Sequence, residues 1–347
     1  MDKYNTNQWK IDSKLKQLTS HPQIQEAAMW IKNNEVVAFP TETVYGLGAN
    51  ALADDAVEKI FTAKGRPNDN PLIVHIASQQ QLSELVSEVT EVAQKLINHF
   101  WPGPLTIVVN SNGKASNKVT AGLSTVAVRM PAHPVALALI EASGLPLAAP
   151  SANRSGKPSP TIAAHVFADL DGKIAGIIDG GITGVGLEST VLDLTGEVPM
   201  ILRPGGVTKT EIERVIGKVI VDPSLVEAKE VPKSPGMKYT HYAPDAPLFI
   251  VNGDKIKLQD FVNQAQKQGK KVGVLTTEED QYFYEADVVL PCGSRQDLSS
   301  VARSLYHVLR EFDLQDLDVI YSESFPKVDV GEAVMNRLLK AAGNRII

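Results

Sequence analysis

The sequence predicts an α/β protein with a large sheet domain at residues 1–217, a linker at 218–247 and a smaller Rossmann-like α/β domain at 248–347. The chain has 347 residues, which is more than one hydrophobic core usually holds, so two domains are expected. Strand-like apolar runs alternate with amphipathic segments on both sides of a stretch that contains five prolines. This alternation is typical of α/β sheets, and the proline-rich stretch is typical of a linker.

The strands and helices of the first domain are predicted from the spacing of apolar residues. Short, often β-branched runs bounded by proline or glycine predict strands, and apolar residues three or four positions apart predict helices. The expected strands are 36–39, 72–76, 105–109, 125–130, 147–149, 176–178, 190–194 and 200–202. The expected helices are 24–33, 54–63, 90–100 and 134–142.

The second domain has the same alternation over a shorter length. Its expected strands are 248–251, 272–275, 288–290 and 319–322, and its expected helices are 257–268, 298–312 and 330–342. This order predicts a small doubly wound sheet. The first strand of the domain lacks the GxGxxG fingerprint of dinucleotide-binding domains.

Composition limits the class of protein. The net charge of −6 argues against a generally basic nucleic-acid binder, although it leaves room for a local basic site. The single cysteine, Cys292, cannot form an internal disulfide, which is typical of a reducing compartment. No apolar run approaches the roughly 20 residues of a membrane span, and the first residues are polar. We therefore expect a cytoplasmic protein that does not cross a membrane.

The segment Pro40–Ala51, PTETVYGLGANA, is the first candidate for a small-molecule site. It follows a predicted strand, and we expect it to form a loop that leads into a helix. Thr41, Thr43 and Tyr45 supply hydroxyl groups, and the glycines allow a ligand to approach the backbone closely. An ordinary turn is the alternative interpretation.

Two further segments are rich in groups that bind phosphate. In Ala63–Ile76, Lys64 and Arg66 can hold a polyphosphate, or can simply neutralise the dipole at the end of the preceding helix. In Ala148–Thr161, small residues around Asn153 leave backbone N–H groups exposed for phosphate or ribose oxygens. A solvated surface loop would have a similar composition.

Polar residues also lie at three other predicted strand ends. Arg203 follows an apolar run, Arg129 lies near the end of one, and Ser189 directly precedes one. His75 lies near the end of the strand after the Lys64 loop. Because an arginine in an apolar strand needs an anion, Arg129 indicates either a carboxylate clamp or a structural ion pair with a nearby acid. His75 is a candidate substrate contact. The sequence lacks GxxxxGK[ST], GxSxG and HExxH, so covalent acyl transfer and zinc hydrolysis are not expected.

The motifs PTETVYGLG, KGRPxxxPL, PGPLT, VAVRxP, APSAN and ESTVxD lie in this order within residues 40–193 and resemble the YrdC-like threonylcarbamoyl-AMP synthases. The SPGMKYTHYAP segment at Ser234–Pro244 and the second domain resemble the longer, two-domain form of that family. The resemblance implies a twisted open α/β sheet for the first domain. It also implies that L-threonine, bicarbonate and ATP are converted to threonylcarbamoyl-AMP, pyrophosphate and water. A tRNA threonylcarbamoyl-transfer machinery would use this product to modify adenosine beside the anticodon.

The resemblance implies roles for individual residues. The catalytic tetrad of the family falls on Lys64, Arg66, Ser151 and Asn153. L-Threonine or its carbamate would contact Thr41, His75, Arg129, Ala149 and Ser189. ATP would contact Lys64, Arg66, Asn68, Thr125, Ser151, Asn153, Ser159, Arg203 and Tyr242. No protein ligand to a metal is assigned.

The implied chemistry needs no nucleophile from the enzyme, because a carbamate oxygen would attack the α-phosphorus of ATP. Lys64, Arg66 and Arg203 would neutralise the developing charge together with a bridging Mg²⁺. Arg129 would hold the threonine carboxylate. A carbamate is labile in water, so we expect the site to close, and we predict that Ser234–Pro244 is the lid.

Two other functions compete with this one. An RNA-binding module is the alternative function, because five basic residues could lie on one face of an open sheet: Lys64, Arg66, Arg154, Lys157 and Arg203. Few aromatic residues for base stacking lie near them, which disfavours that alternative. A carbamoyl transfer like that of the hydrogenase-maturation relatives is disfavoured because no acylphosphatase or zinc-finger segment is visible. Whether the protein binds tRNA directly is left open by the sequence.

Overall fold

The structure is a computed structural model that describes residues 4–225 and 242–347. The chain divides into two compact units. Among the described residues, the first unit holds 4–155, 160–184 and 188–225, and the second holds 156–159, 185–187 and 242–347. Within these ranges, no helix is both long enough and apolar enough to cross a membrane.

The first unit is built on a mixed sheet of 11 strands in the order β1-β8-β2-β3-β7-β4-β6-β5-β9-β10-β11. Strands that are distant in sequence are therefore neighbours in the sheet. The strands are β1 (Asn7–Lys10), β2 (Val37–Phe39), β3 (Gly46–Asn50), β4 (Ile73–His75), β5 (Leu105–Asn110), β6 (Thr125–Arg129), β7 (Leu147–Ala148), β8 (Gly176–Asp179), β9 (Thr190–Asp193), β10 (Met200–Arg203) and β11 (Ile220–Val221).

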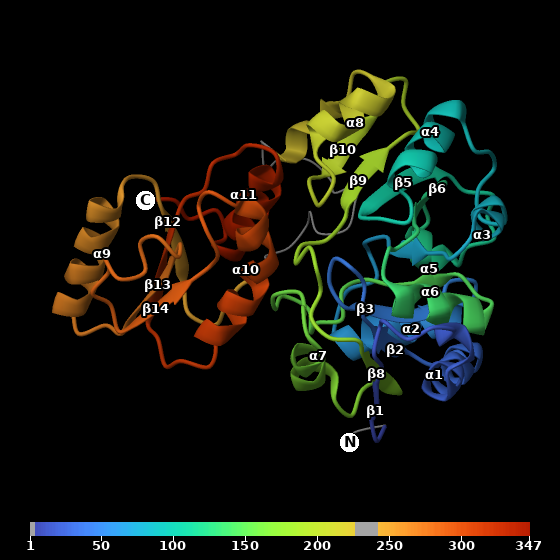
Figure 1. The fold of residues 1–347 in the computed structure, drawn as a ribbon, viewed down its shortest axis with the longest axis horizontal. Coiled ribbons are helices and arrows are strands. Elements are labelled where there is room, and N and C mark those ends of the chain that lie inside the picture. Colours follow the sequence, from blue (N-terminus) through green and yellow to red (C-terminus); the bar gives the residue numbers. More distant parts are fainter. Residues whose placement is uncertain (1–3, 226–241) are drawn as a thin grey trace. The chain divides into compact units, whose positions relative to one another are not determined.

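Eight α-helices and two short 3-10 helices of the described residues accompany this sheet. They are η1 (Leu18–Ser20), α1 (Pro22–Lys32), α2 (Asp54–Lys64), α3 (Gln79–Ser83), α4 (Glu91–Phe100), α5 (Asn117–Thr120), α6 (Pro134–Ser143), α7 (Ala163–Leu170), α8 (Lys209–Ile216) and η2 (Pro223–Leu225). The apolar side chains of α1 and α6 belong to one hydrophobic cluster, and those of α2, α4 and α8 belong to another. Figure 1 shows α1 and α6 side by side, as their mutual packing requires.

The segment predicted to lead from a strand into a helix instead contains a strand. β3 begins at Gly46 and pairs antiparallel with β2, so the prediction for Pro40–Ala51 was wrong in its second half. A β-carbon at Gly48 would lie 2.6 Å from the ring of Phe39, so the glycine lets this ring lie against β3. Glycine is rare in strands, and close packing at one position overrides that preference.

The second unit is a parallel sheet of four strands in the order β12-β15-β13-β14. Its elements are β12 (Leu248–Val251), α9 (Lys255–Lys267), β13 (Val272–Thr276), β14 (Val288–Pro291), α10 (Leu298–Phe312), β15 (Val319–Glu323) and α11 (Val330–Ala341). Helix α9 covers one face of the sheet, and α10 and α11 cover the other (Figure 1). The predicted doubly wound α/β domain is confirmed.

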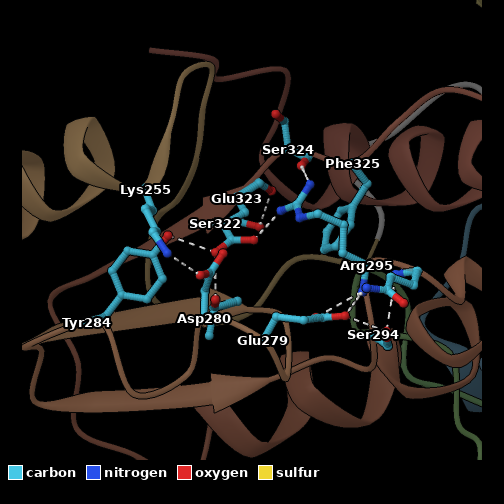
Figure 2. A network of polar contacts seen from close by, with 12 residues as sticks. Lys255, Glu279, Asp280, Tyr284, Ser294, Arg295, Ser322, Glu323, Ser324 and Phe325 are labelled. Carbon is cyan, nitrogen blue, oxygen red and sulfur yellow. Dashed lines mark hydrogen bonds and ion pairs between the residues drawn. The ribbon is translucent and has the colours of Figure 1, made fainter.

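A buried carboxylate joins the carboxyl ends of these parallel strands. Glu323, at the end of β15, is 6% exposed and accepts hydrogen bonds from Thr276 Oγ1 at 2.6 Å and from Tyr284 Oη at 2.7 Å. Arg295 forms an ion pair with the other oxygen of Glu323 and donates to the carbonyl oxygen of Ser324 at 3.1 Å (Figure 2). The charge of Glu323 is thus compensated by three donors, as a buried carboxylate requires. The network connects β13 and β15 with the loops that follow β13, β14 and β15.

Candidate active site

Lys64 connects two of the segments that the sequence singled out. It is the last residue of α2, and Gly65 ends the helix in the left-handed conformation at φ 61°. The Lys64 side chain is buried, and its Nζ donates to the carbonyl oxygens of Ser151 at 2.5 Å and Asn153 at 2.6 Å. The amide of Ser155 donates to the carbonyl oxygen of Lys64 at 2.9 Å. The structure therefore brings Lys64 together with Ser151 and Asn153, which follow it by almost 90 residues in the sequence.

The Ser151–Asn153 segment is held by strand-like pairing beyond the end of β7. Ser151 forms an isolated antiparallel bridge with Gly46, and the amide of Ala152 donates to the carbonyl oxygen of Tyr45 at 2.9 Å. Ser151 Oγ donates to Asn153 Oδ1 at 2.6 Å. Because the backbone of β3 fixes this segment, its hydroxyl and amide groups have defined positions before any substrate binds.

Arg129 ends β6 and is bound on three sides. It is 3% exposed, its Nε donates to the carbonyl oxygen of Gly103 at 3.1 Å, and its Nη1 donates to Thr43 Oγ1 at 2.9 Å. Its Nη2 lies 2.6 Å from Glu42 Oε1. The sequence indicated either a carboxylate clamp or a structural ion pair for Arg129, and the structure contains the ion pair. Glu42 was not among the predicted site residues, although it lies inside the PTETVYGLG motif.

His75 ends β4 and lies beside Arg129 in the parallel register of β4 and β6. The pKa of His75 is lowered to about 3, first by burial and then by the nearby charges of Arg129 and Arg203. The imidazole is therefore neutral at physiological pH. Ala149 follows β7, and its amide donates to the carbonyl oxygen of Ile73 at 2.9 Å, so it too lies beside β4.

Buried polar atoms around Arg129 are incompletely hydrogen-bonded. Among the described residues, Oε2 of Glu42 and Nδ1 of His75 have no hydrogen-bond partner, and Oε1 of Glu42 and Nη2 of Arg129 contact each other only as an ion pair. A buried polar group without a hydrogen bond costs about 1–3 kcal/mol, so such atoms are rare unless a ligand or water completes them. The arrangement fits a small ligand that carries both a carboxylate and hydrogen-bond donors.

Ser189 and Arg203 form a second buried contact at the strand ends. Arg203 ends β10, and its Nε and Nη2 donate to the carbonyl oxygen of Ser189 at 3.1 Å and 2.9 Å. The hydroxyl groups of Ser189 and Thr106 are 2.7 Å apart. Thr41 closes a turn, because its Oγ1 donates to the carbonyl oxygen of Val44 at 2.7 Å. These residues extend the polar surface that begins at Arg129.

Four of the predicted ATP contacts lie outside the Lys64 segment and the strand ends around Arg129. Thr125 is the first residue of β6, four residues before Arg129, and Asn68 is exposed in the loop after α2. Ser159 and Tyr242 belong to the second unit, where the rings of Tyr242 and Tyr306 are 5.0 Å apart. Of the predicted lid, residues 234–241 lie outside the described residues.

The described residues contain no group of three or more histidine, cysteine or acidic side chains that could hold a metal ion. This donor set does not provide a dedicated protein cage for a metal. A Mg²⁺ ion that is bound mainly by substrate phosphates and water does not need such a cage.

Comparisons with known proteins agree with this geometry. Residues 29–205 match the Sua5, YciO and YrdC family, which is described as "Telomere recombination", and residues 207–343 match the family described as "Threonylcarbamoyl-AMP synthase, C-terminal domain". A threonylcarbamoyl-AMP synthase of Bacillus subtilis is 57% identical over 343 residues, which are 99% of each chain. One of Pyrococcus abyssi is 51% identical and covers 93% of this chain and 95% of its own.

A solved structure extends the likeness to the whole fold. The crystal structure of P. abyssi Sua5 complexed with L-threonine superposes with a TM-score of 0.92 at 49% identity and covers 99% of both chains. Both units of the present chain thus have counterparts of the same fold in one relative. The chain belongs to the Sua5/YrdC family of threonylcarbamoyl-AMP synthases, in the two-domain form with a C-terminal Sua5 domain.

Proposed function

We propose that the strand ends around Arg129 bind L-threonine and that the Lys64 segment holds ATP, so that the first unit makes threonylcarbamoyl-AMP from L-threonine, bicarbonate and ATP. The observation that carries this proposal is the buried polar group of Arg129, Glu42 and His75, in which Oε2 of Glu42 and Nδ1 of His75 have no hydrogen-bond partner within the described residues. An amino acid brings a hydrogen-bond donor for Oε2 of Glu42 and for the neutral imidazole of His75, and it brings a carboxylate that the guanidinium of Arg129 can bind alongside Glu42. Glu42 and Thr43 keep the guanidinium oriented for this role.

The remaining threonine contacts follow from the same strand ends. Arg129 would bind the carboxylate, while Thr41 and Ser189 would meet the amine or hydroxyl group. His75 and Ala149 would line the space between them. All five residues are buried and belong to the first unit, which supports a site that excludes water from a labile carbamate.

The phosphates of ATP would bind on the Lys64 side of the site. Lys64, Arg66 and Arg203 supply positive charge, and Ser151 and Asn153 position the nucleotide. The ammonium group of Lys64 donates to three oxygen atoms of Ser151 and Asn153. A phosphate oxygen can replace one of these acceptors without moving the buried side chain far. Asn68, Thr125, Ser159 and Tyr242 stay predicted ATP contacts.

In the reaction, the ammonium group of threonine first loses a proton, and the resulting amine and bicarbonate form a carbamate with loss of water. An oxygen of the carbamate then forms a bond to the α-phosphorus, the bond from that phosphorus to the β-bridging oxygen breaks, and pyrophosphate leaves. Lys64, Arg66 and Arg203 stabilise the charge that develops on the phosphate oxygens. A Mg²⁺ ion that enters with ATP would neutralise further charge on the phosphates, held by them and by water.

The product would pass to a tRNA threonylcarbamoyl-transfer machinery, and we place the enzyme in the cytoplasm, where ATP and tRNA are available. The absence of any disulfide partner for Cys292 supports a reducing compartment. The negative net charge of the chain argues against a broad tRNA-binding surface, so direct binding of tRNA is not part of the proposal.

Release of pyrophosphate tests the proposal. We expect release that requires both L-threonine and bicarbonate, and we expect Arg129→Lys to raise KM for threonine about tenfold or more, because lysine cannot reproduce the planar fork. The matched control is Arg214→Lys on the exposed side of α8, which should leave KM unchanged. Salt-dependent RNA binding without turnover would instead support the RNA-binding module.

A further inference from the structure

Glu42 is a buried carboxylate that uses only one of its two oxygens. It lies in the loop between β2 and β3, where Thr41 Oγ1 accepts hydrogen bonds from the amides of Thr43 at 3.1 Å and Val44 at 3.3 Å. These bonds fix the backbone on the far side of Glu42. Oε1 of Glu42 lies 2.6 Å from Nη2 of Arg129, whereas the equally buried Oε2 has no hydrogen-bond partner in the part of the chain that the structure describes. A buried carboxylate oxygen of this kind is expected to meet a donor in the working enzyme.

The hydrogen bonds of Arg129 bring the nitrogen of threonine next to this oxygen. A guanidinium carries one N–H group on Nε and two each on Nη1 and Nη2. In Arg129 the Nε group donates to Gly103, one Nη1 group donates to Thr43, and one Nη2 group faces Glu42. The other hydrogens of Nη1 and Nη2 form the planar fork that can bind a carboxylate. The nitrogen of an amino acid is bonded to the carbon that carries its carboxylate, so threonine at this fork holds its nitrogen beside Glu42.

Glu42 can take up a proton here more readily than the nearby imidazoles. Burial and the charges of Arg129 and Arg203 lower the pKa of His75 to about 3, so they oppose its protonation. His133 also interacts electrostatically with Glu42, but its Nδ1 accepts a hydrogen bond from an amide of α6 at 3.3 Å and caps that helix. If Glu42 became protonated, the bound threonine carboxylate would still neutralise Arg129. No buried charge would then be left without a counter-ion.

We propose that Glu42 is the proton shuttle of carbamate formation, so that the carbamate forms within the site rather than in solution. This inference rests on the proposed threonine site. The lone pair of the threonine amine forms a bond to the carbon of bicarbonate, and the nitrogen, now positively charged, becomes acidic. Oε2 of Glu42 takes one proton from this nitrogen and donates it to the hydroxyl group that came with bicarbonate. The bond from carbon to that oxygen breaks, water leaves, and Glu42 is again a carboxylate beside the finished carbamate.

Carbamate prepared in advance tests the assignment through pyrophosphate release by the full-length enzyme. Glu42→Gln keeps an oxygen that can face Arg129 but cannot carry a proton. With L-threonine, dilute bicarbonate and ATP at pH 7, we expect kcat of this variant to fall about a hundredfold, as the loss of a general acid–base group does. L-Threonine mixed with bicarbonate at high pH already contains carbamate. When this mixture is diluted rapidly into enzyme and ATP, Glu42→Gln should release a burst of pyrophosphate at the wild-type rate.

The two assays together separate the alternatives. Glu26→Gln, at an exposed position of α1, is the matched control and should behave as the wild type in both. If Glu42→Gln lost the burst as well as the steady rate, Glu42 would only hold Arg129 in place, and the inference would be overturned. A steady rate equal to that of the wild type would also overturn it, because the carbamate would then form in solution. A wild-type enzyme that releases no pyrophosphate even from prepared carbamate would instead refute the proposed function itself.

Discussion

At the scale of single residues, His75 shows how burial sets the chemistry of the threonine side. Its pKa of about 3 results first from desolvation and then from the two neighbouring arginines. A neutral imidazole can accept or donate a hydrogen bond without adding a third positive charge beside Arg129 and Arg203. The same shift has a consequence for stability.

We expect His75 to make the protein less stable as the pH falls from about 6.5 towards 3. In this window the unfolded chain binds a proton at His75 and the folded protein does not, so each pH unit removes about 1.4 kcal/mol of the free energy of unfolding. His75→Gln should remove this contribution. Urea unfolding at pH 7, 6, 5 and 4 measures it.

The control for this measurement is His99→Gln, at an exposed position on α4. It should leave the dependence of stability on pH as in the wild type. If the unfolding free energies of wild type and His75→Gln changed in parallel between pH 7 and 4, the folded protein would bind the proton at His75 after all, and the proposed neutral imidazole would be wrong.

The sequence predicted candidate site residues where they lie in motifs, but it did not predict the contacts that these residues make. The KGRP and SAN segments predicted Lys64 and Asn153 as site residues, yet the hydrogen bond between them appears only in the fold, where the end of α2 meets the segment that follows β7. Glu42 was missed because an acid beside a threonine-rich turn has no special spacing. Its meaning appears only when β6 places Arg129 against it.

At the scale of elements, the β9–β10 hairpin positions Ser189 and Arg203. A β-carbon at Gly205 would lie 2.3 Å from the amide nitrogen of Thr190 and 2.4 Å from the carbonyl carbon of Ser189. Both atoms belong to the backbone, so the chain after β10 can approach Ser189 only with glycine at this position. This approach lets Arg203 donate to the Ser189 carbonyl group.

Gly205→Ala should therefore lower the free energy of unfolding by about 1–3 kcal/mol, as overpacking does, and should weaken threonine binding. The control Gly196→Ala lies in the same hairpin, where the nearest atom to an added β-carbon is 3.8 Å away, and should change stability by less than about 0.5 kcal/mol. Urea unfolding and KM for threonine check both variants. Equal behaviour of the two would show that the close approach does not matter.

Elements with strong local signals were predicted well. Helix α10 has the predicted bounds Leu298–Phe312, because a single apolar face follows the cap at Asp297. Strand β1 was missed because Asn7–Lys10 is polar, and it forms through parallel pairing with β8 and burial of Trp9. Helix α8 was also missed, although Thr208 and Glu211 form a capping box that the sequence displays as TKTE.

At the scale of the whole molecule, each unit has its own hydrophobic core. In the second unit, Leu258 and Val262 of α9 pack with Val274 of β13 and Val319 of β15. In the first unit, Leu96 of α4 packs in a separate cluster with residues of α2. A unit with its own core can unfold cooperatively by itself, and a chain with two such units need not unfold in one step.

We expect two transitions in differential scanning calorimetry, one for each core. Leu258→Ala should lower one transition, and Leu96→Ala should lower the other, because each removes a side chain that is at most 1% exposed and destabilises its core by about 2–5 kcal/mol. Adding L-threonine should raise the transition that Leu96→Ala lowers, since the proposed threonine contacts all lie in the first unit. A single transition that both variants lower equally would mean that the two cores unfold as one cooperative unit.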